Sequence, residues 1–450
     1  MAGPNCPKKK ILILTNLDVW VFDLNSRIAG AGHQVVLNTL LGFANAGYEV
    51  HMITTSRLHS ELPPIHDNVH IHRLPLPWFD LCQKLISIPK YALRKLRSFI
   101  KSTGTPKRPR SFVDFSPPAL WYYTYYFFRP TVARYAVKLA RRIGGVDVVY
   151  GHEVVGAIAA ETVSKQLRVP LVTRFQGTEL SQFLDQPERL MRCKTHVVAL
   201  RADADLIIMA NDGTLGDQVL DFLGVPKKKY RFYIDGVVKD DVHRPDVDVQ
   251  AVRKRFLVPD DCLFLLYAGR MFYWKRIDRL LEVAARVKQD FDDFRLVVVG
   301  DGPEMAAVQT LARNLEVTDH VRFVGAMPHG DLMDLMNACD VYVSFHDLTN
   351  LCNPALEACV CGKCIATTAI GGIQDLLTDN VNAVVCEPHD DVDGIAKRLL
   401  RLLRNPEERK RLRDAAFQQG KTKVKTWVER MEMEVAEIEK TIASSGASRT

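Results

Sequence analysis

Short apolar runs alternate with amphipathic segments along most of the chain. Lys10–Thr15 is an apolar, β-branched run that predicts a strand. The segment Gln34–Ala46 carries apolar residues at helical spacing and stops at Gly47, after which Tyr48–Thr54 predicts a second strand. Strand, helix, glycine and strand in this order are typical of a βαβ unit, whose right-handed crossover gives a parallel sheet.

The same alternation returns and then restarts after a Gly-, Asp- and Pro-containing connection at Ile234–Pro245. We therefore predict an α/β protein of two Rossmann-like, doubly wound domains facing across a cleft, spanning residues 1–240 and 241–426. The strands expected are Val146–Tyr150, Val169–Phe175, Asp205–Met209, Leu263–Ala268, Phe294–Gly300, Val321–Val324, Asp340–Phe345 and Cys364–Thr368. The helices expected in the second series are Ile277–Val287, Met305–Leu315, Leu332–Ala338 and Pro354–Cys361.

Composition places the chain among globular proteins. Its 450 residues are 47% apolar and 25% charged, which excludes a disordered or fibrous chain, and the formal net charge of +7 is a mild excess. No apolar run reaches the roughly 18–20 residues that span a bilayer, and the first apolar run is too short for a signal peptide. We expect a cytoplasmic location, in the cytosol or on a cytosolic membrane face.

Ten cysteines without a secretory signal predict reduced thiols. Cys361 and Cys364 form a CxxC, but no second CxxC or nearby histidine pair completes a zinc set. We interpret the cluster of Cys352, Cys359, Cys361 and Cys364 as small buried thiols. His33, His66 and His70 lie at no predicted strand end, so the sequence predicts no metal site.

A basic and aromatic insertion occupies residues 84–130. Lys84–Arg110 contains nine Lys or Arg and no acid, and Trp121–Phe128 is almost entirely aromatic. A basic amphipathic helix can lie on an anionic membrane surface with aromatic residues at the headgroup level. The alternative is a solvated basic loop leading to aromatics that pack on the sheet. No nucleic-acid partner is expected, because no binding module accompanies the charge.

Cations follow the first strand of the second series. Arg270 lies at the strand end and Lys275 just before the helix at Ile277. Arg, Lys and a helix N-terminus together suit a diphosphate. The alternative is a pair of surface cations. In the first domain, Gly30, Ala31 and Gly32 lack side-chain bulk before a helix and can approach phosphates. Their spacing does not match a dinucleotide fingerprint, which disfavours a dehydrogenase.

Further polar residues lie at predicted strand ends or helix starts. Glu357, placed by the prediction in the first turn of its helix, can accept two ribose hydroxyls or simply complement the helix dipole. His152, with Glu153 beside it, can reach a substrate hydroxyl and share its proton, although a lone histidine is usually structural. Gln176 and Glu179 end the following strand in the same way.

The second half of the chain resembles the retaining glycosyltransferases of family four. The run Ala268–Leu281 is similar to their donor-binding motif, with Arg270, Lys275 and Asp278 in the expected places. Further segments follow in the family's order over roughly residues 260–430: Val298–Glu304, Val321–Gly325, Ala338–Val341, Asn353–Gly362 and Ile370–Asp375.

The resemblance implies a GT-B fold, with a last helix in residues 427–444 returning to the first domain. It implies metal-independent, retaining transfer of a hexosyl group from a nucleotide sugar, favouring UDP-sugars over GDP-sugars, with no cofactor. Arg270 and Lys275 would hold the diphosphate, and His152 would lie by the reacting sugar. The remaining donor-binding residues would be Gly30, Ala31, Gly32, Asp347, Thr349, Asn350, Asn353 and Glu357, with Glu153 and Gln176 on the acceptor side.

One position departs from the family pattern. The family pairs two glutamates eight residues apart, and the first falls at Thr349. Either the donor sugar differs, or Asp347 takes the role, or transfer is weakened. A catalytically weak nucleotide-sugar-binding scaffold therefore remains as an alternative to a glycosyltransferase. A nucleotide-sugar 2-epimerase, an enzyme class that shares the architecture, is the other alternative.

Overall fold

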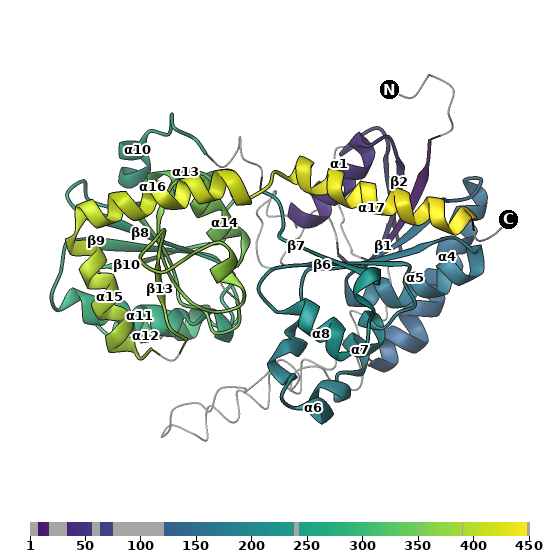
Figure 1. The fold of residues 1–450 in the computed structure, drawn as a ribbon. Coiled ribbons are helices and arrows are strands. Elements are labelled where there is room, and N and C mark those ends of the chain that lie inside the picture. The colour runs from purple at the N-terminus through teal and green to yellow at the C-terminus, as the bar shows by residue number, and fades with distance from the viewer. Residues whose placement is uncertain are drawn as a thin grey trace.

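The computed structural model describes residues 8–17, 34–55, 64–74, 121–237, 243–349, 351–388 and 390–447. They form two lobes, each built on one parallel β-sheet with helices on both faces (Figure 1). The predicted α/β class with two doubly wound sheets is confirmed.

The sheet of the first lobe has seven parallel strands in the order β3-β2-β1-β4-β5-β6-β7. Its central strands are buried along their whole length because helices cover both faces. The strands are β1 Lys10–Thr15, β2 Glu49–Thr54, β3 Val69–Arg73, β4 Val148–His152, β5 Leu171–Phe175, β6 Leu206–Ala210 and β7 Tyr230–Tyr233. The helices are α1 Gln34–Asn45, the π-helix η2 Tyr123–Phe128, α4 Arg129–Arg142, α5 Glu153–Leu167, α6 Pro187–Arg192, α7 Lys194–Leu200 and α8 Gly216–Phe222, with short 3₁₀ turns η3 Glu179–Phe183 and η4 Lys227–Lys229.

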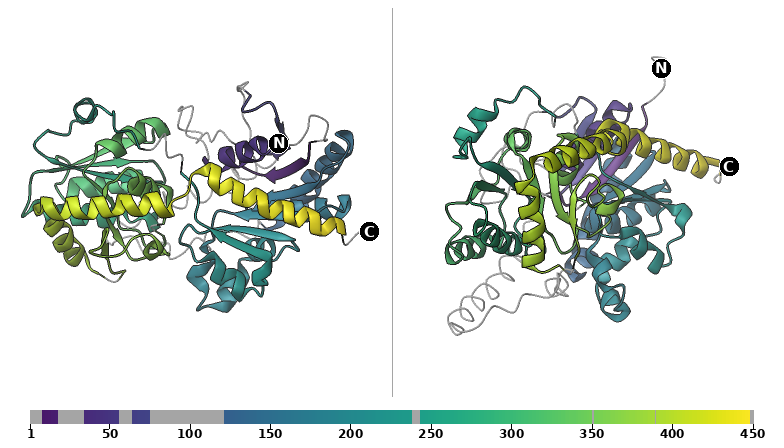
Figure 2. Two further views of the ribbon diagram at one scale, coloured as in Figure 1. Left: turned by 45° about the horizontal axis from the view of Figure 1, so that its top comes forward. Right: turned by 60° about the vertical axis from the view of Figure 1, so that its left-hand side comes forward.

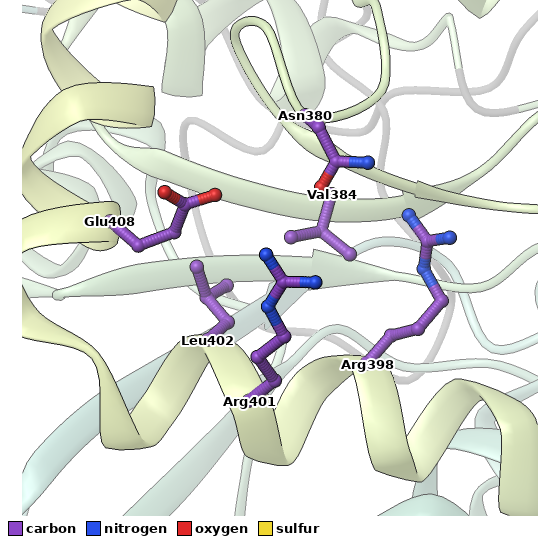
Figure 3. Close-up of a pocket in the computed structure, with 6 residues that line it drawn as sticks. All are labelled: Asn380, Val384, Arg398, Arg401, Leu402 and Glu408. Atoms are coloured by element: carbon purple, nitrogen blue, oxygen red, sulfur yellow. The ribbon is translucent and has the colours of Figure 1, made fainter.

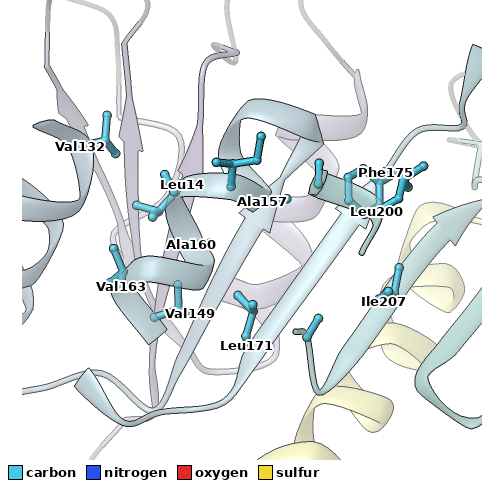
Figure 4. Close-up of a cluster of buried hydrophobic side chains, with 14 of the residues drawn as sticks. Leu14, Val132, Val149, Ala157, Ala160, Val163, Leu171, Phe175, Leu200 and Ile207 are labelled. Atoms are coloured by element: carbon cyan, nitrogen blue, oxygen red, sulfur yellow. The ribbon is translucent and has the colours of Figure 1, made fainter. Parts of the chain in front are cut away.

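Two apolar cores sandwich this sheet. On one face, Leu14, Val149 and Leu171 of the strands meet Ala157 and Val163 of α5 (Figure 4). On the other face, the alternate strand residues pack against α1 and the C-terminal helix. Because successive strand residues point to opposite faces, one short apolar strand supplies both cores.

The sheet of the second lobe has six parallel strands in the order β10-β9-β8-β11-β12-β13. The strands are β8 Leu263–Ala268, β9 Phe294–Val299, β10 Val321–Gly325, β11 Val341–Ser344, β12 Cys364–Thr368 and β13 Val384–Cys386. The helices are α10 Val249–Arg255, α11 Ile277–Lys288, α12 Met305–Asn314, α13 His329–Ala338, α14 Asn353–Val360, α15 Val392–Arg404 and α16 Pro406–Lys423, with 3₁₀ turns η5 Tyr273–Lys275 and η6 Ile373–Asp375.

The last helix, α17 Trp427–Ala447, leaves the second lobe and runs along the first (Figure 2). Its Trp427 and Met431 join the apolar core beside α1. The hydroxyl of Tyr150 in β4 donates a hydrogen bond of 2.5 Å to Glu434, which also pairs with Arg430 at 3.0 Å. The hydrogen bond between Tyr150 and Glu434 therefore links α17 directly to β4.

Three short strands were missing from the prediction: β3, β7 and β13. All three lie at the edges of the described sheets and have only three to five residues, too few to show a clear period, and β3 and β7 are only partly buried. The strands predicted from Val146 and Val169 begin two residues later, at Val148 and Leu171. Pro170 has no N–H to donate, so it cannot take part as a full ladder residue.

Part of the basic and aromatic insertion lies outside the described residues, including all of Lys84–Arg110. In the aromatic run, Phe128 packs in the core, whereas Tyr122, Tyr126 and Phe127 have exposed fractions of 57%, 59% and 66%. In the described parts of the chain, no helix combines the length and the hydropathy needed to cross a membrane.

Candidate active site between the lobes

The loop after β8 carries Arg270 and Lys275 and packs against the glycine-containing turn after β9. Gly300 has a φ of +131°, and a Cβ there would lie 1.9 Å from the carbonyl oxygen of Gly269. The backbone N–H of Met271 donates to the carbonyl of Asp301 at 2.9 Å. The turn after β9 is therefore a support for the cation-bearing loop, and only glycine allows so close an approach.

The two cations of this loop have different surroundings. Lys275 is half-buried, and its Nζ lies 3.4 Å from Nδ1 of His346, just beyond the end of β11. Arg270 is exposed, with its guanidinium 4.9 Å from the centre of the Phe272 ring. The structure thus brings Lys275 to a buried histidine, whereas Arg270, on the same loop, is exposed.

His346 is a site residue that the sequence did not single out, although it follows a strand end like the others. It is fully buried, and its Nδ1 lies 2.8 Å from the carbonyl oxygen of Thr349, to which an Nδ1–H donates. Burial, and then the charge of Lys275, lower the pKa of His346 well below its usual value. The imidazole is therefore neutral at physiological pH, and the amine of Lys275 supplies the positive charge at this point.

Thr349 forms part of a direct contact between the lobes. Its hydroxyl donates a hydrogen bond to the backbone carbonyl of Asp212, which follows β6 in the first lobe. Next to it, a Cβ on Gly213 would lie 1.8 Å from the carbonyl oxygen of Gly371. The hydroxyl predicted to contact a donor sugar thus bonds to the opposite lobe in this structure. Asn350 lies outside the described residues.

Asp347 is held by two arginines at the start of α11. Arg276 donates to both carboxylate oxygens at 3.0 and 2.7 Å, and Arg279 donates to one of them. The carboxylate therefore anchors the loop after β11 to α11. In this arrangement Asp347 is engaged with cations of its own lobe instead of standing free as a substitute sugar ligand.

Glu357 lies one residue deeper in its helix than predicted. Because α14 begins at Asn353, Glu357 falls in the second turn, so the predicted placement in the first turn is wrong. Its side chain is buried, and Oε1 lies 2.8 Å from Nε2 of His329 at the start of α13. His329 thus orients this carboxylate. Asn353 is half-buried at the first position of α14.

In the first lobe, His152, Glu153 and Gln176 lie at the carboxyl ends of adjacent strands. His152 is buried as the last residue of β4, and Glu153 starts α5 with a φ of +63°. The backbone N–H of Gln176 donates to Oε1 of Glu153 at 2.8 Å, and its side-chain amide donates to Asp235. Backbone strain at a non-glycine residue is typical of functional sites.

Three carboxyl groups at this edge have strongly raised pKa values. Burial raises the pKa of Glu153, Glu179 and Asp212 to about 7 in each case, and repulsion from Asp212 adds to the effect at both glutamates. Lys275 of the second lobe lowers the pKa of Asp212 against this rise, so its amine acts on the first lobe. The sequence analysis did not single out Asp212. Its signal was the one that singled out His152, a polar residue at the carboxyl end of a strand, here β6.

The arrangement combines groups that accept hydrogen bonds with one half-buried cation. On the first lobe, carboxyl groups with a pKa of about 7 can exchange protons with hydroxyl groups near neutral pH. On the second lobe, the Lys275 amine can stabilise developing negative charge. Gly30, Ala31 and Gly32 lie outside the described residues, so their predicted phosphate contacts stay a prediction.

Two other features involve side chains that are not part of this site. A cavity of about 70 Å³ in the second lobe is lined by residues of β13, α15 and α16, including Arg398 and Arg401 (Figure 3). Cys359, Cys361 and Cys364 are buried, and burial raises the pKa of Cys359 and Cys364 to about 12. The prediction of buried thiols is confirmed for these three residues, whereas Cys352 is only half-buried.

Comparisons with known proteins agree with this architecture. The chain is 30% identical over 291 residues to D-inositol 3-phosphate glycosyltransferase of Streptosporangium roseum, covering 62% of this chain and 66% of that protein. It is 25% identical over 278 residues to glycogen synthase of Mycobacterium tuberculosis, covering 60% and 64%. The chain thus spans slightly less than two thirds of the length of these relatives.

The fold matches solved structures over nearly the whole chain. Anabaena HepE in complex with UDP-glucose superposes with a TM-score of 0.67 at 15% identity, covering 96% of this chain and 99% of that one. The predicted GT-B fold is therefore confirmed. The family described as "Glycosyl transferases group 1" matches residues 248–419, which include the whole sheet of the second lobe. Over its second lobe the chain is similar to the group 1 glycosyl transferases, in agreement with the resemblance that the sequence motifs indicated.

Proposed function

We propose that this chain is a retaining, metal-independent glycosyltransferase that moves a hexosyl group from a nucleoside diphosphate sugar to a hydroxyl acceptor. A UDP-sugar is the favoured donor and a GDP-sugar the second choice. The observation that carries the proposal is the position of Lys275, whose amine lies beside buried His346 and acts on Asp212 of the opposite lobe.

Transfer from a nucleoside diphosphate sugar requires positive charge beside the leaving diphosphate. In the transfer, the bond between the anomeric carbon and the diphosphate oxygen breaks, and the acceptor oxygen bonds to the same carbon on the same face. The departing diphosphate gains negative charge, which a fixed cation stabilises more in a low-dielectric site than in water. Lys275, with Arg270 on the same loop, supplies the charge for which other enzymes use a divalent ion.

The acceptor hydroxyl must lose its proton as the new bond forms. His152 was predicted to lie by the reacting sugar, and Glu153 and Asp212 have pKa values of about 7, which suits proton exchange at neutral pH. Glu357, oriented by His329, remains our proposed ligand for the ribose hydroxyls.

We place the acceptor at a membrane surface. The basic segment Lys84–Arg110 precedes the exposed aromatic side chains of Tyr122, Tyr126 and Phe127, a combination that suits an anionic lipid surface. The Streptosporangium roseum relative is named for transfer involving inositol 3-phosphate, a phosphorylated polyol. A phosphorylated, polyhydroxyl or lipid-linked acceptor fits both the positive charge of Lys84–Arg110 and the substrate in the name of this relative.

The test is a transfer assay with labelled UDP- and GDP-sugars, run with and without EDTA, beside calorimetry with UDP and GDP. We expect one nucleotide to bind and one sugar to be transferred with retention in the presence of EDTA. An epimerised nucleotide sugar formed without acceptor would establish the 2-epimerase instead. Tight nucleotide binding without transfer or hydrolysis would establish the scaffold, and no nucleotide binding would refute the proposal.

A further inference from the structure

Three histidines and a glutamate gather on one face of the first sheet, at its edge. Strands β2 and β3 pair in parallel, with His51 opposite His70 and Ile53 opposite His72. Residues two apart on a strand share a face, so Glu49 and His51 of β2 lie on the same face as His70 and His72 of β3. Pairing of these two strands is what brings the four side chains together.

Their donor atoms are close enough for one ion. Nε2 of His51 lies 2.9 Å from Oε1 of Glu49, and Nδ1 of His51 lies 3.1 Å from Nε2 of His72. One ligand atom each of Glu49, His51 and His70 lies within 4.8 Å of the others. The imidazole of His51 stacks against those of both His70 and His72, with ring centres 4.9 and 5.4 Å away.

We infer that Glu49, His51 and His70 form a binding site for a divalent transition metal ion, with zinc the ion that two imidazoles and one carboxylate suit best. With Nε2 of His51 on the ion, its Nδ1–H donates to Nε2 of His72. His72 then acts as a positioning residue that fixes the tautomer and the ring.

Lys10 is the competing cation at this position. Its Nζ lies 3.6 Å from Oε2 of Glu49 and donates to the carbonyl of Ile143 at 2.5 Å. A divalent ion would displace the Lys10 amine from Glu49, the longer of these two contacts. Lys10 would keep its hydrogen bond to the carbonyl of Ile143. The other cation that acts on the cluster is Arg142, at the end of α4.

The site has a structural role in this position. Among the strands that the structure describes, β3 lies at the edge of its sheet and pairs with β2 alone. An ion shared by β2 and β3 ties this edge to the sheet just before the basic insertion begins. His51 is the third residue of β2, whereas the proposed transfer site lies at the carboxyl ends of the strands. The ion would therefore stabilise the fold without taking part in the transfer.

The test is calorimetric titration of the metal-stripped full-length chain with zinc chloride, beside absorption spectra with Co²⁺. We expect one ion per chain and a rise in the melting temperature. His70→Ala, an exposed position, should weaken zinc binding at least tenfold, and His72→Phe should weaken it by about 10–100-fold. The matched control is His243→Ala, an exposed histidine of the second lobe, which should bind as the wild type does.

Several results would overturn the inference. One is the absence of zinc binding at about 100 µM by wild-type chain that circular dichroism shows to be folded. Another is unchanged affinity in both His70→Ala and Glu49→Gln. A third is a thiolate-to-cobalt charge-transfer band, which would place the ion on cysteines. If His70→Ala does not fold, Glu49→Gln decides, since its amide oxygen still accepts from His51.

Discussion

Replacing Glu153 by Gln should change how the stability of the protein depends on pH. Burial raises the pKa of Glu153 from its ordinary 4.5 to about 7, so the folded state binds a proton more tightly than the unfolded state does. The free energy of unfolding of the wild type therefore falls as pH rises from about 4.5 to 7, where the folded carboxyl ionises. Glutamine keeps the shape and accepts the N–H of Gln176 but carries no charge.

The magnitude follows from the shift of about 2.5 pKa units, which at about 1.36 kcal/mol per unit is a penalty of about 3 kcal/mol once the group is ionised. At pH 5 the penalty is only about 1 kcal/mol. Between pH 5 and pH 8, urea unfolding should show Glu153→Gln gaining about 2–3 kcal/mol over the wild type. Glu161→Gln, on the outer side of the same helix, is the control. If the free energies of unfolding of the wild type and Glu153→Gln change in parallel between pH 5 and pH 8, the raised pKa of Glu153 is refuted.

Three further predictions concern the site and the surface. Lys275→Ala should lower turnover by about 10²-fold or more in the transfer assay, by removing charge stabilisation of the leaving diphosphate; turnover equal to that of surface variant Lys288→Ala would contradict the role. Gly213→Ala should loosen the contact between the lobes, because its φ is +86° and the new Cβ would lie 1.8 Å from the carbonyl oxygen of Gly371; small-angle scattering identical to the wild type would count against this. Vesicle flotation should weaken when three basic residues of the insertion become neutral, and identical flotation would remove the membrane proposal; these are Arg94, Lys95 and Arg97.

Local patterns were enough to predict most of the strands and several site positions. Short buried strands are apolar throughout and helices show their period, so β1, β8 and α11 could be placed from the sequence. In a parallel sheet, polar residues at strand ends gather at one edge, which singled out His152 and Lys275. β3 and β7 were not predicted because they are short and only partly buried, and β13 was not predicted because it has only three residues.

Contacts between distant segments were decided only by the tertiary structure. Nothing near Glu357 in the sequence shows that His329 binds it, and nothing near Thr349 shows that its hydroxyl bonds to Asp212, because these pairs are 28 and 137 residues apart. The histidine cluster shows the same limit. His70 looked structural by itself, and only the register of β2 against β3 places it beside His51 and Glu49. A residue's neighbours along the chain set its local conformation, whereas the chemistry of a site depends on which strands pair and in which register.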